Sequence, residues 1–93
     1  MVGTSQNLST VSSIAKSITS TKGNAYIVVG GAYSSQPSSL TVTGATSLYN
    51  DSIGYPASSR IFCGVATGTT LSATVRWGSS VPEVYVRIYE ITI

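Results

Sequence analysis

Apolar and polar residues alternate with a period of two along much of the chain after residue 24. In the clearest segment, apolar residues occupy every second position from Leu71 to Trp77, and polar residues fill the positions between them. Successive side chains of a β-strand point to opposite faces, so this pattern predicts a strand with one buried face. Shorter segments of the same type lie between Gly-, Pro- and Ser-rich stretches, at 26–29, 40–43, 47–49 and 60–67. We predict an all-β domain, a single small β-sandwich with jelly-roll or immunoglobulin-like connections.

The last ten residues, 84–93, carry apolar residues on both faces of the predicted strand. One face begins with three aliphatic residues at alternate positions from Val84, and the other consists mainly of Tyr85, Arg87, Tyr89 and Ile91. Ten extended residues span about 33 Å, which is long for so small a domain. Either the strand is buried on both faces within one chain, or its second face contacts another subunit. We favour the second interpretation and predict that these four residues form a subunit interface.

Residues 1–24 differ in composition from the rest of the chain, being rich in Ser and Thr and free of aromatic residues. Apolar residues recur at nearly helical spacing, and Lys22-Gly23 suits a helix end. Ser and Thr are indifferent helix formers, however, so an extended segment is a close alternative. We predict an N-terminal docking arm over 1–24, with a partly helical and an extended conformation as the alternatives, and a sandwich domain over 25–93. The arm is expected to pack on its own domain or on a neighbour through Leu8, Val11, Ile14 and Ile18.

Charged residues are scarce, at 9% of the 93 residues against about 25% in ordinary globular proteins. A compact monomer of this mass exposes roughly 5,000 Å², which leaves about one formal charge per 600 Å². The 17 serines and 12 threonines offer one explanation, a surface that is soluble through hydroxyl groups. The other explanation is that copies of the chain or a partner cover much of the surface, and we favour it because protein interfaces are poor in Lys, Glu and Asp.

Few residues are suited to chemistry. The chain has no histidine and one cysteine, Cys63, so we expect neither a metal site nor a cofactor. Ser13 and Lys16 match a serine–lysine pattern that arises easily among 17 serines, and 64–70 lacks the lysine of a phosphate-binding loop. Five dispersed basic residues do not form a stripe for nucleic acid, and no apolar run is long enough to span a membrane. We therefore expect a protein that is not an enzyme and binds neither nucleic acid nor membrane.

A sugar-binding role is a second hypothesis. Trp77 and Tyr49 offer flat faces on which a pyranose ring stacks, and Asn50 and Asp51 offer hydrogen bonds to its hydroxyls. The structural alternative places Trp77 in the core, as the continuation of the apolar face that begins at Leu71.

The composition and several short segments of the sequence resemble those of a group of viral proteins. A Ser/Thr-rich start, very few charges, and the phrases LTVTGAT at 40–46 and GTTL at 68–71 resemble small accessory proteins of tailed bacteriophage virions. These are the capsid decoration (cement) proteins and the terminal domains of fibres. The resemblance implies a homo-oligomer that binds the major capsid protein or another virion protein and stabilises that lattice. It also implies a location in the virion after assembly in the host cytoplasm, and the lone cysteine agrees with that compartment. The alternative function is a receptor- or carbohydrate-binding fibre or tail module.

Overall fold

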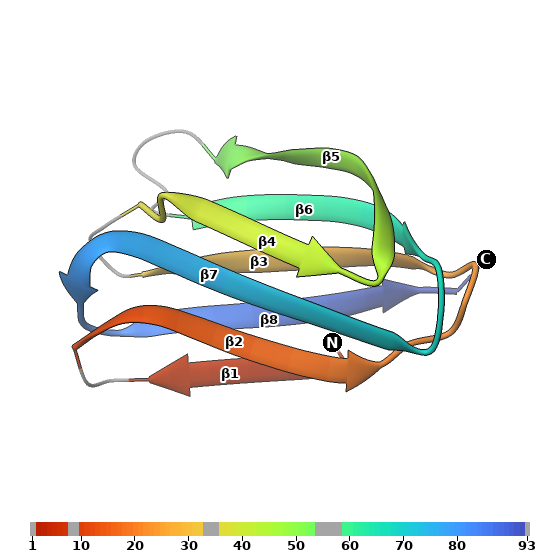
Figure 1. Ribbon diagram of the computed structural model, residues 1–93, viewed down its shortest axis with the longest axis horizontal. Helices are drawn as coiled ribbons and strands as arrows, with labels where there is room; N and C mark the ends of the chain where they lie inside the picture. Colours follow the sequence, from red (N-terminus) through yellow and green to blue (C-terminus); the bar gives the residue numbers. More distant parts are fainter. Residues whose placement is uncertain (1, 8–9, 33–35, 54–58, 93) are drawn as a thin grey trace.

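The protein is a sandwich of two antiparallel β-sheets (Figure 1). The computed structural model describes residues 2–7, 10–32, 36–53 and 59–92, with the backbone alone for 51–53. Its eight strands are β1 (Gly3–Asn7), β2 (Val11–Thr19), β3 (Ala25–Ala32), β4 (Ser39–Thr43), β5 (Ala45–Ile53), β6 (Ser59–Ala66), β7 (Thr70–Val81) and β8 (Val84–Ile91). The predicted β-sandwich is confirmed, although it contains two more strands than the segments recognised in the sequence. The described residues include no helix, and therefore none that could cross a membrane.

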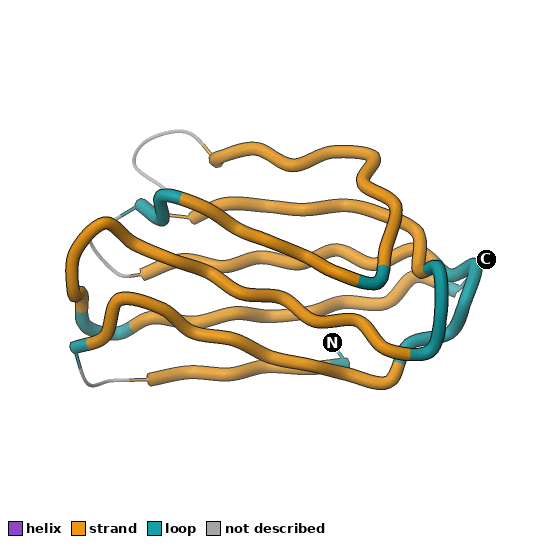
Figure 2. The backbone as a smooth tube through the Cα atoms, in the orientation of Figure 1, coloured by secondary structure: helices purple, strands orange, loops and turns teal. Residues whose placement is uncertain are grey.

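Five strands form one sheet in the order β1-β8-β3-β6-β5, and three form the other in the order β2-β7-β4. Consecutive strands mostly change sheet, and β5 and β6 are the only consecutive pair that are hydrogen-bonded neighbours. The described loops, drawn in teal, lie at the two ends of the sandwich (Figure 2). Each sheet therefore has an inner face that packs on the other sheet and an outer face that is turned away from it.

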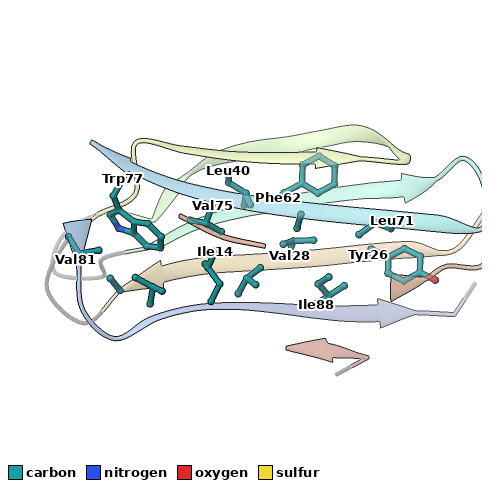
Figure 3. Packing of buried hydrophobic residues seen from close by; sticks show 14 of the residues in the cluster. Ile14, Tyr26, Val28, Leu40, Phe62, Leu71, Val75, Trp77, Val81 and Ile88 are labelled. Carbon is teal, nitrogen blue, oxygen red and sulfur yellow. The ribbon is translucent and has the colours of Figure 1, made fainter. Parts of the chain in front are cut away.

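The core lies between the two sheets (Figure 3). Val28 of β3, Val75 of β7 and Ile88 of β8 are completely buried there. Trp77 is 6% exposed and extends the buried face of β7 toward one end of the core. Burying aliphatic and aromatic side chains stabilises such a sandwich because each buried side chain contributes about 1.5–3 kcal/mol.

The N-terminal segment is part of this sandwich, which corrects the expectation of a separate arm. β1 pairs with β8 in the five-stranded sheet, and β2 pairs with β7 in the three-stranded sheet. Ile14 belongs to the buried core, and Val11 and Ile18 pack against it, whereas Leu8 lies outside the described residues. The helical alternative is wrong for the described residues, which form strands. Ile14 and Ile18 are four positions apart and therefore lie on the same, inner face of β2. The segment therefore docks on its own domain.

Two glycines occupy positions where a Cβ atom has no room. Gly30 lies inside β3, and a Cβ atom there would come within 2.3 Å of Cγ2 of Val75 in the opposite sheet. Gly44 joins β4 to β5 with a φ of +88°, and a Cβ atom would come within 2.1 Å of the Thr70 carbonyl oxygen. Glycine is required at both positions, for packing of the sheets at the first and for conformation and packing at the second.

Candidate interaction surface

The outer face of the five-stranded sheet is apolar, and we call it the apolar face. Residues opposite one another in antiparallel strands project to the same side of the sheet. The strand register therefore gathers the outward-facing side chains of β3, β5, β6 and β8 on one surface. They are Ala25, Ile27, Val29, Thr46, Tyr49, Ile61, Cys63, Val65, Tyr85, Arg87, Tyr89 and Ile91. The edge strand β1 adds the polar side chains of Thr4 and Gln6 to the same side of the sheet.

These side chains form continuous rows across the strands. In one row Tyr89 lies opposite Ile27, Ile27 opposite Cys63, and Cys63 opposite Tyr49. The two tyrosines at its ends are 38% and 52% exposed, respectively. Ile91, which is 48% exposed, lies in the next row beside Ala25. An apolar surface spread over four neighbouring strands is typical of a protein interface rather than of scattered exposed residues.

Arg87 carries the only formal charge on this face among the described side chains. Its guanidinium carbon lies 4.6 Å from the centre of the Tyr85 ring, within the range of a cation–π interaction. The guanidinium therefore lies along the sheet surface against an aromatic ring. Tyr and Arg are two of the residue types most enriched at protein interfaces.

The outer face of the three-stranded sheet has a different character, and we call it the hydroxyl face. Three rows cross it: Ser13–Arg76–Ser39, Ala15–Thr74–Thr41 and Ser17–Ser72–Thr43. Seven of these nine residues are Ser or Thr, and the Ser17 and Ser72 hydroxyls lie 2.7 Å apart in a hydrogen bond. The numerous hydroxyl groups thus keep one face of the sandwich compatible with water, while the opposite face is apolar.

The predicted interface residues Tyr85, Arg87, Tyr89 and Ile91 lie together on the apolar face, where β8 lies between β1 and β3. This placement follows from the alternation already visible in the sequence. The sequence did not reveal that β3, β5 and β6 extend the same surface, because that depends on how distant strands pair.

The predicted sugar-binding residues are dispersed. Trp77 is in the core, as the structural alternative anticipated, while Tyr49 lies on the apolar face. Asn50 points toward the other sheet and donates a hydrogen bond of 3.1 Å from Nδ2 to the Leu40 carbonyl of β4. The side chain of Asp51 lies outside the described residues.

A polar cluster at one end of the sandwich escaped the sequence analysis. The Tyr26 hydroxyl donates to Oε2 of Glu90 at 2.5 Å, and Asn24 Nδ2 donates to the same oxygen at 3.1 Å. The Thr21 amide in turn donates to the Tyr26 hydroxyl at 2.8 Å. The available signal was a glutamate on the inner face of β8, which is otherwise aliphatic, since such a carboxylate needs hydrogen-bond donors.

These hydrogen bonds shift both ionisation equilibria. The donors Tyr26 and then Asn24 lower the pKa of Glu90 from its ordinary 4.5, against an opposing effect of burial. Burial, followed by the hydrogen bond to Glu90, raises the pKa of Tyr26 above its ordinary 10.0. Both shifts favour a neutral tyrosine bound to an ionised glutamate, an arrangement that holds β3, β8 and the β2–β3 turn together.

Within the described ranges, no three His, Cys, Asp or Glu side chains gather into a group that could hold a metal ion. The fold and surface define an all-β sandwich with one apolar and one hydroxyl face. Comparisons with protein-family models, curated proteins and solved structures find no match to this chain.

Proposed function

We propose that this chain is a non-enzymatic structural protein of a virion, a decoration protein that attaches to a repeating protein lattice through its apolar face. The observation that carries the proposal is the contrast between the two outer faces, one apolar with Arg87 as its only described charge, the other lined with Ser and Thr hydroxyls. A protein attached to a lattice needs one face that excludes water and one that remains in it.

The dimensions of the apolar face suit this role. The four strands that form it, spaced about 4.8 Å apart and about eight residues long, cover roughly 500 Å² in plan. Side chains that project from the sheet make the accessible area larger than this flat area. The accessible area is therefore comparable with the area of about 800 Å² that each partner buries in a standard interface. The surface of the isolated chain totals 5015 Å², so such contact would cover more than a tenth of it.

Attachment through a sheet replaces the expected attachment through an N-terminal arm. β1 and β2 belong to the two sheets, and the apolar side chains of β2, Val11, Ile14 and Ile18, are already engaged in or against the core. The apolar face is therefore the surface that we assign to the lattice, with the major capsid protein or another virion protein as the partner.

A carbohydrate-binding fibre or tail module is a second candidate, favoured by the two exposed tyrosine rings. Tyr49 and Tyr89 end the same row of the apolar face, and aromatic faces stack on sugar rings. A glycan screen that detects binding by the intact chain and loses it with Tyr49→Ala and Tyr89→Ala would support this candidate over the first.

The test of the first candidate uses virus particles purified from the source of the chain. We expect mass spectrometry to find the chain in many copies per particle, and immunogold labelling to place it on the capsid surface. Particles stripped of the chain and then supplied with purified protein should rebind it and release their genome at a higher temperature than bare particles do.

A matched pair of variants separates the two faces in this rebinding assay. Ile91→Lys places a charge on the apolar face and should abolish rebinding, whereas Thr74→Lys places the same charge on the hydroxyl face and should leave rebinding intact. Absence of the chain from purified particles, or equal rebinding by both variants, would contradict the proposal.

A further inference from the structure

The four strands at the sheet edges differ in how far their free sides are protected. An unprotected edge presents unpaired backbone N–H and C=O groups and is a template for pairing with another strand. β1 is five residues long and has β2 close against it, since a Cβ atom at Gly3 would lie 2.6 Å from Cγ2 of Ile18. The stem of Lys16 in β2 also approaches Gly3, and an inward-directed lysine is a common means of protecting an edge.

β4 is protected in another way. It is also five residues long, and its Leu40 carbonyl accepts the hydrogen bond from the Asn50 side chain. This bond links β4 to β5 at one point on the inner side of the sandwich. β1, β2 and β4 are therefore poor templates for a further strand.

β5 is longer than β1 and β4, and β6 is the strand that lies alongside it, while the Asn50 side chain links it to β4 at one point. It is nine residues long and pairs with β6 on one side only. Residues 45–50 contain no charge and no proline, and Leu48 and Tyr49 are 70% and 52% exposed. Leu48 is the most exposed large apolar side chain among the described residues.

Leu48 also lies at an irregularity of the strand. Ser47 lies opposite Gly64 and Tyr49 lies opposite Cys63, so Leu48 is an extra residue without a partner in β6. Such a bulge disrupts the ladder on the β6 side and bends the strand locally. The extra residue, Leu48, is turned to solvent, as its exposure shows. The strand thus presents its largest exposed aliphatic side chain at the middle of an open edge.

We propose that two copies of this chain pair their β5 strands antiparallel about a two-fold axis near Leu48, forming a continuous ten-stranded sheet. Residues 45–51 of each copy then pair with 51–45 of the other, at about one backbone hydrogen bond per paired residue. Cβ atoms of directly opposite residues lie about 4.5–5.5 Å apart, so the two Leu48 side chains cover each other.

A second copy fits this edge for two reasons. A two-fold axis lets the same residues serve both partners, which is the commonest symmetry of protein oligomers. Residues 45–50 are uncharged, so no like charges meet within that stretch when identical strands pair. The dimer also places two apolar faces side by side on one sheet, so a lattice that binds one binds both with a gain in avidity.

The first test of this pairing is to measure the mass of the protein in solution as a function of its concentration. The intact chain should reach about twice its 9.6-kDa mass at high concentration by analytical ultracentrifugation. Leu48→Lys should remain monomeric over the same range, with at least a tenfold weaker association, while keeping a native circular dichroism spectrum. Thr41 is also exposed and lies on the edge strand β4, so Thr41→Lys is the control. This variant should dimerise as the unmodified chain does.

A cross-linking test locates the axis. In a Cys63→Ser background, Leu48→Cys should form a disulfide-linked dimer under mild oxidation, because the two Cβ atoms are within reach of a disulfide. Thr41→Cys in the same background should remain largely monomeric. A monomer at all concentrations, or a dimer that survives Leu48→Lys and cross-links equally through position 41, would overturn the proposal.

The outcome does not depend on whether the chain binds a virion. Ile91→Lys should leave the dimer intact while abolishing particle binding, and Leu48→Lys should abolish the dimer and weaken particle binding only through lost avidity. Dimerisation without particle binding would therefore support the edge pairing and count against the function proposed above.

Discussion

Tyr26 and Glu90 occupy directly opposite positions on β3 and β8, and the tyrosine hydroxyl donates a hydrogen bond of 2.5 Å to the glutamate carboxylate. The ring of Tyr26 is buried, and its hydroxyl also accepts a hydrogen bond from the Thr21 amide. One side chain thereby joins two strands of the sheet to the turn that leads from β2.

Removal of the Tyr26 hydroxyl should destabilise the fold without disturbing its core. Tyr26→Phe leaves a ring of the same shape but deprives the Thr21 amide of its acceptor and Glu90 of a donor. Two hydrogen bonds are lost at about 1 kcal/mol each, so we expect the melting temperature to fall by roughly 10 °C in a domain of this size. The control Tyr85→Phe, at a partly exposed site, should melt within a degree of the unmodified protein, and equal melting of both variants would contradict this role of Tyr26.

The same pair predicts how stability depends on pH. Because folding lowers the pKa of Glu90, its ionisation contributes stability above its ordinary 4.5, and this contribution is lost as the pH falls through the folded-state value. Because folding raises the pKa of Tyr26, its contribution is complete below 10.0 and is lost as the pH rises above that value. Chemical unfolding between pH 2 and pH 12 should show both losses, with a smaller acid loss in Tyr26→Phe and no alkaline loss from residue 26. An unchanged pH profile in that variant would rule out the coupling.

The turn between β7 and β8 should tolerate a stabilising substitution. Glu83 has a φ of +57°, a left-handed conformation that costs residues other than glycine about 1–2 kcal/mol. Glu83→Gly removes this cost but adds about 0.5–1 kcal/mol of backbone entropy to be lost on folding, so we expect a net gain of about 0.5–1 kcal/mol. Urea unfolding measures it. Glu83→Ala removes the same carboxylate and keeps a Cβ atom, so a matching gain in that variant would mean that backbone conformation is not the cause.

Close packing of the two sheets at Gly30 should be sensitive to a single methyl group. Gly30→Ala directs a Cβ atom toward the Val75 side chain, and overpacking of this kind costs about 1–3 kcal/mol. The double variant Gly30→Ala with Val75→Ala should lose less stability than the two single variants together, because the smaller side chain relieves the contact. Gly78→Ala is the matched control, since no atom lies within 4 Å of a Cβ atom there. Additive effects of the two substitutions would show that Gly30 and Val75 do not compete for space.

The two faces of β8 should respond oppositely to a charge. Ile88 is completely buried and Ile91 is 48% exposed on the apolar face. Ile88→Lys should prevent folding, because an unpaired ammonium cannot be buried at an acceptable cost, whereas Ile91→Lys should fold with nearly unchanged stability. Trp77 fluorescence reports the result, since its emission moves to longer wavelength when the core opens. Unfolding by Ile91→Lys would mean that the apolar face is required for the fold itself.

Local sequence patterns determined the strand character of this protein. Alternation from Leu71 to Trp77 and from Val84 onward depends only on neighbouring residues, so β7, β8 and the two faces of β8 were visible without a structure. The N-terminal strands were harder to recognise, because Ser and Thr are compatible with several conformations and few apolar residues mark the period. The tertiary structure confirmed that Trp77 belongs to the core rather than to a sugar site.

Relationships between distant residues were decided by tertiary structure alone. Tyr26 and Glu90 are 64 positions apart, and they meet only because β8 pairs with β3 in one particular register. The same register extends the row from Tyr89 through Ile27 and Cys63 to Tyr49 and so creates the apolar face. Whether a segment is extended depends on the alternation of apolar and polar side chains within it. Which strands pair depends on how distant segments together bury the core. The sequence therefore determined which segments are extended, and the packed sheets decided which of their side chains share a surface.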